Sequence, residues 1–233
     1  MAKMKRRLSG LSEHSIFYKE NAAIYEKFSK AEDAPGRILK AITPKLKGKT
    51  VLDVGCGTGK YIKFLAPSVK AYYGLDISAH QLLIAKQKIR NIKNVKLIRA
   101  DASKMKLPSD FFNAAVAFWA ISPVAGWDRK GKAINEVMRT LKHGSSFYLI
   151  ENDMGSFFEK IRGPQRRRET QAYNTWTTRH GFRVIKRIKT YFEFVSRKEA
   201  KKIFSDIWGD EVGSQILTRR VGHNVIIFEK KKK

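Results

Sequence analysis

The stretch VLDVGCGTGK, residues 51–60, places an acid and three alternating glycines directly after an apolar run. Glycines at the end of a strand let a backbone approach a ligand closely. The dinucleotide pattern G-x-G-x-x-G is excluded because Lys60 stands where its third glycine would be. The triphosphate pattern G-x-x-x-x-G-K-[ST] fails as well, since from Gly55 it requires a second glycine at the same position, and the later G-K step is followed by Tyr61. The remaining pattern, D-x-G-x-G-x-G from Asp53, suits a ligand with a positive group.

Two further acids follow the next predicted strands. Asp76 lies at the end of the second strand, and Asp101 with Ala102 follows the third. Ligands of open α/β sheets bind at the carboxyl ends of the strands, so these acids and Asp53 are expected at one edge. A carboxylate there can accept both hydroxyls of a ribose, and Asp101 can accept a hydrogen bond from an adenine amino group. The order predicts an adenosine across three strand ends, with a cationic group near Asp53.

Apolar runs and helical patterns alternate between residues 50 and 150, which indicates an α/β protein with an open, mostly parallel sheet and helices on both faces. The predicted strands are residues 50–54, 71–77, 95–100, 112–121 and 146–150. The predicted helices between them are residues 60–65, 79–92 and 132–141, the second with Ser78 as its N-cap.

The flanks of this alternation have different patterns. Helices are predicted over residues 15–29 and 37–42, so we divide the chain into an N-terminal helical cap (1–48) and a ligand-binding domain (49–233). The alternation ends after Glu151. Strand-like segments return at 181–194 and 225–228, with a helical segment at 197–203.

With these motifs, the sequence resembles the class I S-adenosylmethionine-dependent methyltransferases. VLDVGCGTGK is similar to the family's first motif, GLDIS to the second and RADASKMKLP to the third, over about residues 49–151. Within this family, the sequence is similar to the ubiquinone/menaquinone-biosynthesis type of methyltransferase. The chain departs from many relatives at Asn113, at Ser122-Pro123 and at the turn His143-Gly144-Ser145.

The resemblance implies a Rossmann-like fold with a seven-stranded sheet and a small N-terminal helical cap or lid, with substrate-facing insertions in residues 152–222. It also implies S-adenosyl-L-methionine as cofactor, S-adenosyl-L-homocysteine as product, and an enzyme that methylates an acceptor. The implied cofactor-binding residues are Asp53, Gly55, Cys56, Gly57, Gly59, Asp76, Ile77, Asp101, Ala102 and Phe118, with Tyr18 and Tyr25 closing over the cofactor or packing within their helix.

No residue is a clear catalytic base. Glu151 and Asp153, at the end of the fifth strand, are weak candidates by topology. Trp119 follows Phe118, and strand alternation favours core packing on the opposite face over contact with the substrate. The arginine cluster at 162–168 could bind a phosphate or carboxylate, but we favour an exposed loop.

The formal net charge is +27, from 48 basic and 21 acidic residues spread over the whole chain. It indicates either a polyanion-binding enzyme or a lysine-rich solvated surface. We expect a small-molecule acceptor, with a tRNA or rRNA acceptor, prompted by the charge, or a protein acceptor as alternatives. The segment after the fourth strand, Ala120 to Pro123, lacks the [D/N]-P-P-[YF] motif of enzymes that methylate base amino groups.

Cysteine and histidine usage argues against a metal site. The single cysteine, Cys56, excludes a disulfide within the chain and a cysteine-based zinc site. The five histidines lack ligand spacing, so no metal is expected. No apolar h-region follows the basic start, and the longest apolar run, 111–121, is too short for a membrane span. These features predict a cytoplasmic protein; its oligomeric state is open.

Overall fold

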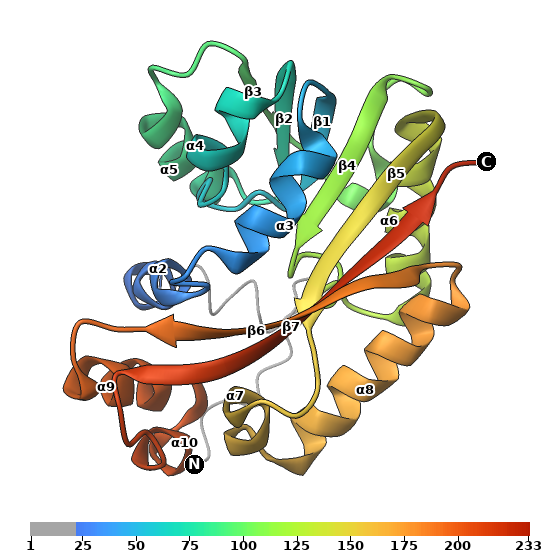
Figure 1. Ribbon diagram of the computed structural model, residues 1–233. Helices are drawn as coiled ribbons and strands as arrows, with labels where there is room; N and C mark the ends of the chain where they lie inside the picture. The colour runs from blue at the N-terminus through green and yellow to red at the C-terminus, as the bar shows by residue number, and fades with distance from the viewer. Residues whose placement is uncertain (1–21) are drawn as a thin grey trace.

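A single sheet organises residues 22–233, the part of the chain that the computed structural model describes. Its seven strands lie in the order β3-β2-β1-β4-β5-β7-β6, and only β7 runs antiparallel to its neighbours (Figure 1). The strands are β1 (Thr50–Val54), β2 (Ala71–Asp76), β3 (Val95–Arg99), β4 (Phe112–Phe118), β5 (Leu141–Asn152), β6 (Arg183–Glu193) and β7 (Arg220–Lys231). The predicted seven-stranded, mostly parallel sheet is confirmed.

Helices cover both faces of the sheet and precede or connect its strands. They are α2 (Ala22–Ala31), α3 (Arg37–Leu46), α4 (Ile62–Leu65), α5 (Ala79–Ile89), α6 (Trp127–Thr140), α7 (Phe157–Ile161), α8 (Gly163–Arg179), α9 (Arg197–Trp208) and α10 (Asp210–Ser214), with short 3-10 turns at Ala66–Ser68 and Ala102–Lys104. The helices α2 and α3 precede the first strand, and the division of the chain into a cap and a ligand-binding domain stays a prediction.

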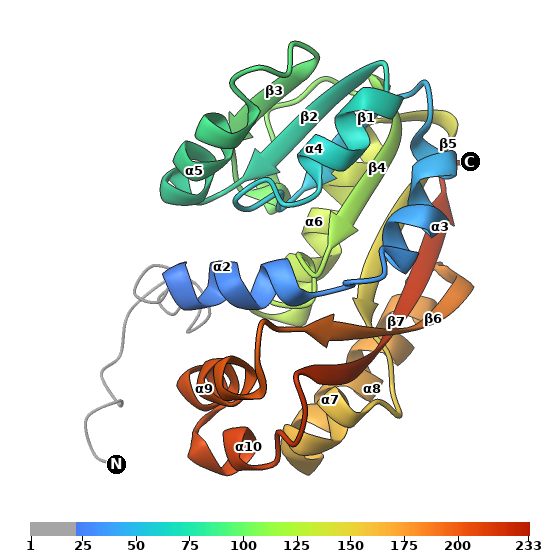
Figure 2. The same cartoon turned by 60° about the vertical axis from the view of Figure 1, so that its left-hand side comes forward.

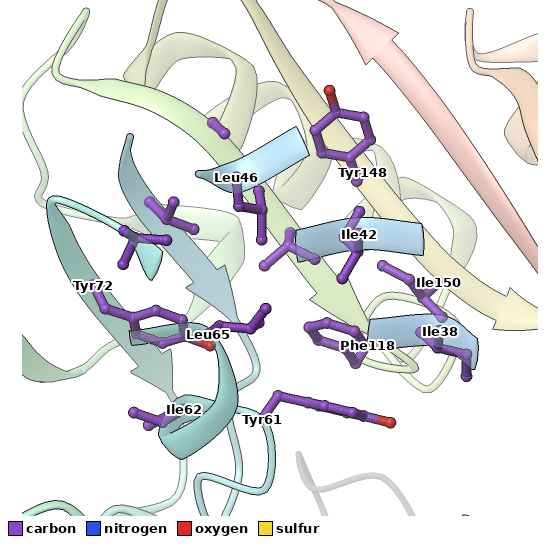
Figure 3. Close-up of a cluster of buried hydrophobic side chains, with 14 of the residues drawn as sticks. Ile38, Ile42, Leu46, Tyr61, Ile62, Leu65, Tyr72, Phe118, Tyr148 and Ile150 are labelled. Carbon is purple, nitrogen blue, oxygen red and sulfur yellow. The ribbon is translucent and has the colours of Figure 1, made fainter. Parts of the chain in front are cut away.

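Strand alternation divides the core into two layers. Along β4, Ala114, Val116 and Phe118 face α3 and α4, whereas Ala115 and Ala117 face α6 and α8. Figure 3 shows the first layer, in which the apolar side of α3 lies over β4 and β5. Its buried side chains include Ile38, Ile42 and Leu46. Because central strands bury both faces, β4 is apolar along most of its length.

A third cluster lies where β6 and β7 extend beyond the parallel strands and carry α9 and α10. Figure 2 shows α2 crossing above this extension. The ring of Phe28 on α2 packs 4.7 Å from that of Phe192 and 5.2 Å from that of Trp208. We call the group formed by Phe28, Phe158, Phe192, Phe204 and Trp208 the cap cluster. It holds α2 over the strand ends of the sheet.

Two sequence predictions near the sheet are wrong. Residues 163–179 form the helix α8, where we favoured an exposed loop for the arginine cluster. Pro164 occupies the first turn, where its missing N–H costs nothing, and arginine is a good helix former. The predicted fourth strand also ends at Phe118 rather than at residue 121, because Trp119 adopts a positive φ of 49°.

The other differences are shifts of element boundaries. Helix α3 continues through Pro44 to Leu46, and α6 begins at Trp127, five residues before the predicted start at Lys132. Strands β5 and β7 continue beyond their predicted ends because they pair with each other antiparallel over Ser146–Asn152 and Val225–Lys231, and β7 begins earlier than predicted because it also pairs with β6. The sequence lacks a local signal for that long-range pairing.

Candidate functional site

The glycine turn after β1 requires glycine for two reasons. Gly55, Gly57 and Gly59 have φ angles of 74°, 55° and 75°, in the left-handed region that side chains disfavour. A Cβ atom on Gly55 would also lie only 2.4 Å from the Cβ of Ala120, in the segment that follows β4. The turn thus packs its backbone directly against the end of the neighbouring strand.

Asp76, at the carboxyl end of β2, fixes the turn and retains acceptor capacity. Its Oδ2 accepts the N–H of Gly57 at 2.9 Å, and its Oδ1 accepts the N–H of Ser78 at 2.8 Å. Each oxygen keeps a further lone pair, enough to accept the two hydroxyls of a ribose. Burial raises the pKa of Asp76 in spite of these bonds. Next to it, Ile77 is 55% exposed, an apolar side chain available to an adenine ring.

Asp53 lies inside the sheet next to the turn, and its carboxylate is incompletely satisfied. Its Oδ2 accepts the hydroxyl of Tyr72 at 2.5 Å, but Oδ1 is buried with no hydrogen-bond partner among residues 22–233. Burial raises the pKa of Asp53 to about 7. A buried acceptor without a donor is costly, and an ammonium group, directly or through water, would relieve that cost. The residue therefore fits the amino end of a methionine moiety.

Asp101 and Ala102 follow β3 and begin a 3-10 turn. Asp101 caps that turn by accepting the N–H and the hydroxyl of Ser103 on Oδ1, and it pairs through Oδ2 with Arg129 at 3.0 Å. Partial burial raises the pKa of Asp101, but the bonds from Ser103 and the charge of Arg129 bring it below its usual value. One lone pair of Oδ2 stays available for an adenine amino group.

Cys56 is buried within the turn rather than presented as a reactive thiol. A Cβ atom on Gly74 of β2 would lie 2.9 Å from its Sγ atom, so the thiol fills the space above that glycine. Burial raises the pKa of Cys56 well above its usual value. Its contact with the cofactor stays a prediction, and a redox role has no support in this environment.

Phe118 and Trp119 lie together at the end of β4. The ring of Phe118 stacks on that of Tyr61 at 3.9 Å, as Figure 3 shows. The prediction that Trp119 lies on the opposite face of the strand from Phe118 is wrong. Because Trp119 has a positive φ, its side chain packs against the same cluster as Phe118. Its ring stacks on that of His223 at 5.8 Å. Trp119 is therefore a candidate for contact with the methyl acceptor, and we call the region of Phe118, Tyr61 and Trp119 the acceptor side.

Helix α2 is connected to the glycine turn by polar contacts. Glu26 accepts the hydroxyl of Thr58 at 2.9 Å, and Lys60 donates to the Oε2 atom of Glu32, in the turn after α2, at 3.1 Å. Tyr25 packs on the cap cluster, with its ring 6.3 Å from that of Phe28. Tyr18 lies outside the described residues, so its predicted lid role, like that of Tyr25, stays a prediction.

The two weak candidates for a catalytic base both have structural contacts. Glu151 is 1% exposed and accepts the hydroxyls of Ser122 and Tyr173, at 2.8 and 3.2 Å, on the α8 side of the sheet. Burial raises the pKa of Glu151 to about 7. Asp153 pairs with Arg187 at 2.7 Å. Neither carboxylate has a contact that places it with Phe118 and Trp119.

Sequence reasoning missed a polar chain that runs across this end of the sheet. Lys60 bonds to Glu32, whose Oε1 lies 3.9 Å from Nδ1 of His223. His223 in turn bonds through Nε2 to Oδ1 of Asn152 at 2.8 Å, and that oxygen also accepts the Trp119 indole N–H at 3.1 Å. Five parts of the chain contribute, so no local motif could reveal the group. The only signal was Lys60, the last residue of the glycine motif.

Within residues 22–233, no group of three or more histidine, cysteine, aspartate or glutamate side chains could hold a metal ion. In the same part of the chain, no helix has the length and apolarity needed to cross a bilayer.

Comparison with known proteins assigns the domain that carries this site. The family model described as a methyltransferase domain matches residues 52–149. These residues contain the glycine turn, Asp76, Asp101 and Phe118. The matched segment therefore runs from β1 to β5 and includes the three strand-end acids.

Two curated relatives are similar to this chain over slightly less than half of its length. A tRNA (carboxymethyluridine(34)-5-O)-methyltransferase of Arabidopsis thaliana is 37% identical over 44% of this chain and 24% of its own length. A demethylmenaquinone methyltransferase of Geobacillus stearothermophilus is 31% identical over 48% of this chain and 49% of its own. The chain thus spans about half the length, or less, of these relatives.

A solved structure shares the fold more completely. A SAM-dependent methyltransferase from Aquifex aeolicus superposes with a TM-score of 0.58 at 18% identity, covering 94% of this chain and 99% of that one. The superposition extends beyond the matched domain, so the β6–β7 pair belongs to the same fold.

Proposed function

Residues 52–149 form a class I S-adenosylmethionine-dependent methyltransferase domain, and on this premise we propose that the whole protein methylates a small-molecule acceptor. S-adenosyl-L-methionine is the co-substrate of such a domain and supplies a methyl group on a positively charged sulfur. Asp76 is proposed to hold the ribose hydroxyls and Asp53 the methionine ammonium. Asp101 and Ile77 complete the adenine side.

The catalytic contribution of this chain is mainly positioning. Methyl transfer is an in-line displacement, so the donor and the acceptor must be held collinear, and correct placement alone gives a large acceleration. The glycine turn is held by the hydrogen bond from the Gly57 N–H to Asp76, and at Gly55 it packs against Ala120. Those contacts leave the turn little freedom once the ligand is bound.

The aromatic side chains of the acceptor side are the observation that favours a small molecule. Phe118 stacks on Tyr61, and Trp119 packs against the same cluster. Helix α2 and the turn after it are bound to the neighbouring glycine turn through Glu26 and Glu32. Small-molecule sites are typically enclosed and lined by aromatic side chains with a few polar groups. An RNA base could enter such a site only after leaving its stack.

Isotope transfer tests the proposal. The purified protein is incubated with S-adenosylmethionine labelled on the methyl group and with cell extract that is then separated into RNA, protein and small molecules. We expect label in the small-molecule fraction and background labelling with the Asp76→Ala variant. Label confined to RNA or to protein would refute the proposed acceptor class and leave the domain assignment intact.

A tRNA acceptor is the second candidate, favoured by the net charge of +27 and by the tRNA-modifying relative. Exposed arginines on α8, among them Arg166, Arg167 and Arg168, could contact phosphates. Phosphate contacts release counterions, so the binding constant for tRNA would fall steeply with salt concentration. A filter-binding titration that shows no retention of bulk tRNA at moderate salt would argue against this candidate.

A further inference from the structure

His223 on β7 is a buried polar side chain that stacks on Trp119 of the acceptor side. It is 1% exposed, and its imidazole lies between the rings of Trp119, at 5.8 Å and 28°, and Phe192, at 4.7 Å and 14°. The ring of Phe158 packs against the imidazole in a T-shaped arrangement, with 5.1 Å between the ring centroids and 77° between the planes. Aromatic rings therefore fix the plane of the imidazole, and only its polar edges can interact with other groups.

The hydrogen bonds of Asn152 determine the tautomer of His223. The indole N–H of Trp119 can only donate, so the atom that receives it at 3.1 Å is the amide oxygen of Asn152. The same oxygen lies 2.8 Å from Nε2 of His223, which must therefore carry the proton. In the neutral ring, Nδ1 is left with its lone pair.

That lone pair has no hydrogen-bond partner among residues 22–233, although the atom is fully buried. Most buried polar groups are satisfied, so a buried orphan requires an explanation. Oε1 of Glu32 lies 3.9 Å away, too far for a hydrogen bond, and an acceptor oxygen cannot satisfy a lone pair. Nδ1 of His223 therefore lacks a donor, such as the hydroxyl of a ligand.

The charged groups around His223 come from three segments. Glu32 approaches from the turn after α2, Lys60 from the glycine turn, and Arg162 from the end of α7. Burial, together with the positive charges of Arg162 and Lys60, holds the pKa of His223 well below its usual value. The ring is thus neutral at physiological pH, and the Nδ1 lone pair carries no proton.

Resting on the proposed function, we propose that His223 is the general base of the methyl transfer and that the acceptor presents a hydroxyl group to its Nδ1 atom. In this proposal the hydroxyl takes the position beside Nδ1 that Oε1 of Glu32 faces, and the acceptor enters when α2 and the turn after it move away. The geometry therefore names the acceptor class: a small molecule that is methylated on oxygen.

The proton and the electrons balance without another reactant. The acceptor's O–H bond breaks, and its proton forms an N–H bond with Nδ1 of His223. The oxygen's electron pair forms the bond to the methyl carbon, while the pair of the carbon–sulfur bond returns to sulfur. The resulting imidazolium lies beside the carboxylate of Glu32, which compensates its charge until α2 opens and the proton leaves to water.

The need for a base selects oxygen over other nucleophiles. An amine attacks with a lone pair that it already has, and a thiol ionises readily near neutral pH, whereas a hydroxyl gains most from proton removal during attack. A neutral imidazole held in one orientation by Trp119, Phe192 and Asn152 is suited to that task. It would contribute little to the methylation of an amine.

The experiment compares wild type with His223→Phe, which keeps the aromatic stack, and with His143→Phe, the same substitution at an exposed histidine. Asn152 retains the Trp119 donor in the first variant, so its side chain stays anchored. Single-turnover label transfer is measured on whichever extract fraction wild type labels. We expect His223→Phe to be slower by about 10²–10⁴-fold, the usual contribution of a positioned base, with S-adenosylmethionine affinity unchanged and His143→Phe at the wild-type rate.

The pH profile separates a base from a structural residue. In His223→Phe the rate should rise with pH as the acceptor hydroxyl loses its proton to solvent, whereas a general loss of packing would lower the rate equally at every pH. A variant within threefold of wild type at neutral pH, or one with an unchanged profile, would overturn the proposal. Label in RNA would refute the small-molecule acceptor, yet the ratio of the two proteins on that RNA would still test His223.

Nitrogen-15 NMR of histidine-labelled wild type provides a readout that requires no acceptor and no folded variant. We expect His223 to show a neutral ring with the proton on Nε2 at neutral pH, assigned by its loss in a His223→Gln sample or, if that variant does not fold, by contacts to Trp119. A proton on Nδ1, or a doubly protonated ring, would overturn the proposal even if no extract fraction accepts label.

Discussion

Replacement of Gly55 by alanine tests the packing of the glycine turn most directly. The residue has a φ of 74°, and the added Cβ would lie 2.4 Å from the Cβ of Ala120. Ordinary carbon–carbon contacts lie at about 3.5–4.0 Å, so one of the two segments must move. Since Cβ of Ala120 is attached directly to the backbone, no side-chain rotation can relieve the clash.

The expected loss of folding stability in Gly55→Ala has two parts. Left-handed backbone costs about 1–2 kcal/mol for a residue with a side chain. Overpacking at a site that cannot adjust adds about 1–3 kcal/mol. We therefore expect Gly55→Ala to lower the free energy of unfolding by about 2–5 kcal/mol in total.

Gly57 provides the matched control. It has a similar φ of 55°, but the nearest atom to its added Cβ is Oε1 of Gln81 at 3.7 Å, an ordinary contact. Gly57→Ala should therefore show only the backbone part, about 1–2 kcal/mol. Urea unfolding followed by tryptophan fluorescence gives both values, and their difference isolates the contact with Ala120.

A second-site change identifies that contact as the cause. Ala120→Gly removes the Cβ that Gly55→Ala would meet, so the double variant should recover about 1–3 kcal/mol relative to Gly55→Ala. If the two single glycine variants are equally stable, or if Ala120→Gly gives no recovery, the close approach of the turn to the end of β4 is refuted.

Two further predictions concern the carboxylates of the cofactor side. Asp76→Ala removes the acceptor for the predicted ribose hydroxyls and should weaken S-adenosylmethionine binding by about 10–100-fold, as lost hydrogen bonds to a charged group do; calorimetry that gives an affinity within threefold of wild type would contradict the assignment. Asp53 has a folded-state pKa of about 7, raised above its unfolded value, so its ionisation makes the folded state less stable as pH rises from about 4 to about 7. The Asp53→Asn variant has no carboxylate to ionise at this position. Its free energy of unfolding relative to wild type should therefore grow between pH 5 and pH 8, by at most about 1.4 kcal/mol per pH unit. Urea midpoints that shift in parallel for both proteins would contradict this prediction.

The arrangement of the three acids could be predicted because its determinants are local. Each acid lies at or just beyond the carboxyl end of its own strand, and parallel strands bring Asp53, Asp76 and Asp101 to one edge whatever the rest of the chain does. The left-handed glycines likewise mark a turn in the sequence itself. Only the direction of Cys56, toward Gly74, depended on a neighbour that the motif does not show.

The acceptor half could not be predicted because it is assembled from distant segments. His223 pairs opposite Thr190 in an antiparallel ladder, and Glu32 reaches it from the turn after α2. The placement of Trp119 was wrong for a related reason. Strand periodicity assumes that the strand continues, and a single positive φ at this residue reverses the face on which its side chain lies.

Lys60 connects the glycine turn with the segment after α2. It belongs to the glycine turn, yet its Nζ bonds to Glu32, which lies after α2 and faces His223. Separating a largely buried ion pair is costly, so the turn, the end of α2 and the surroundings of the imidazole are expected to move together. Opening α2 for the acceptor therefore also disturbs the turn that would hold the cofactor. The lysine that excludes a dinucleotide and a triphosphate in the sequence is thus the residue through which cofactor binding would organise the proposed base.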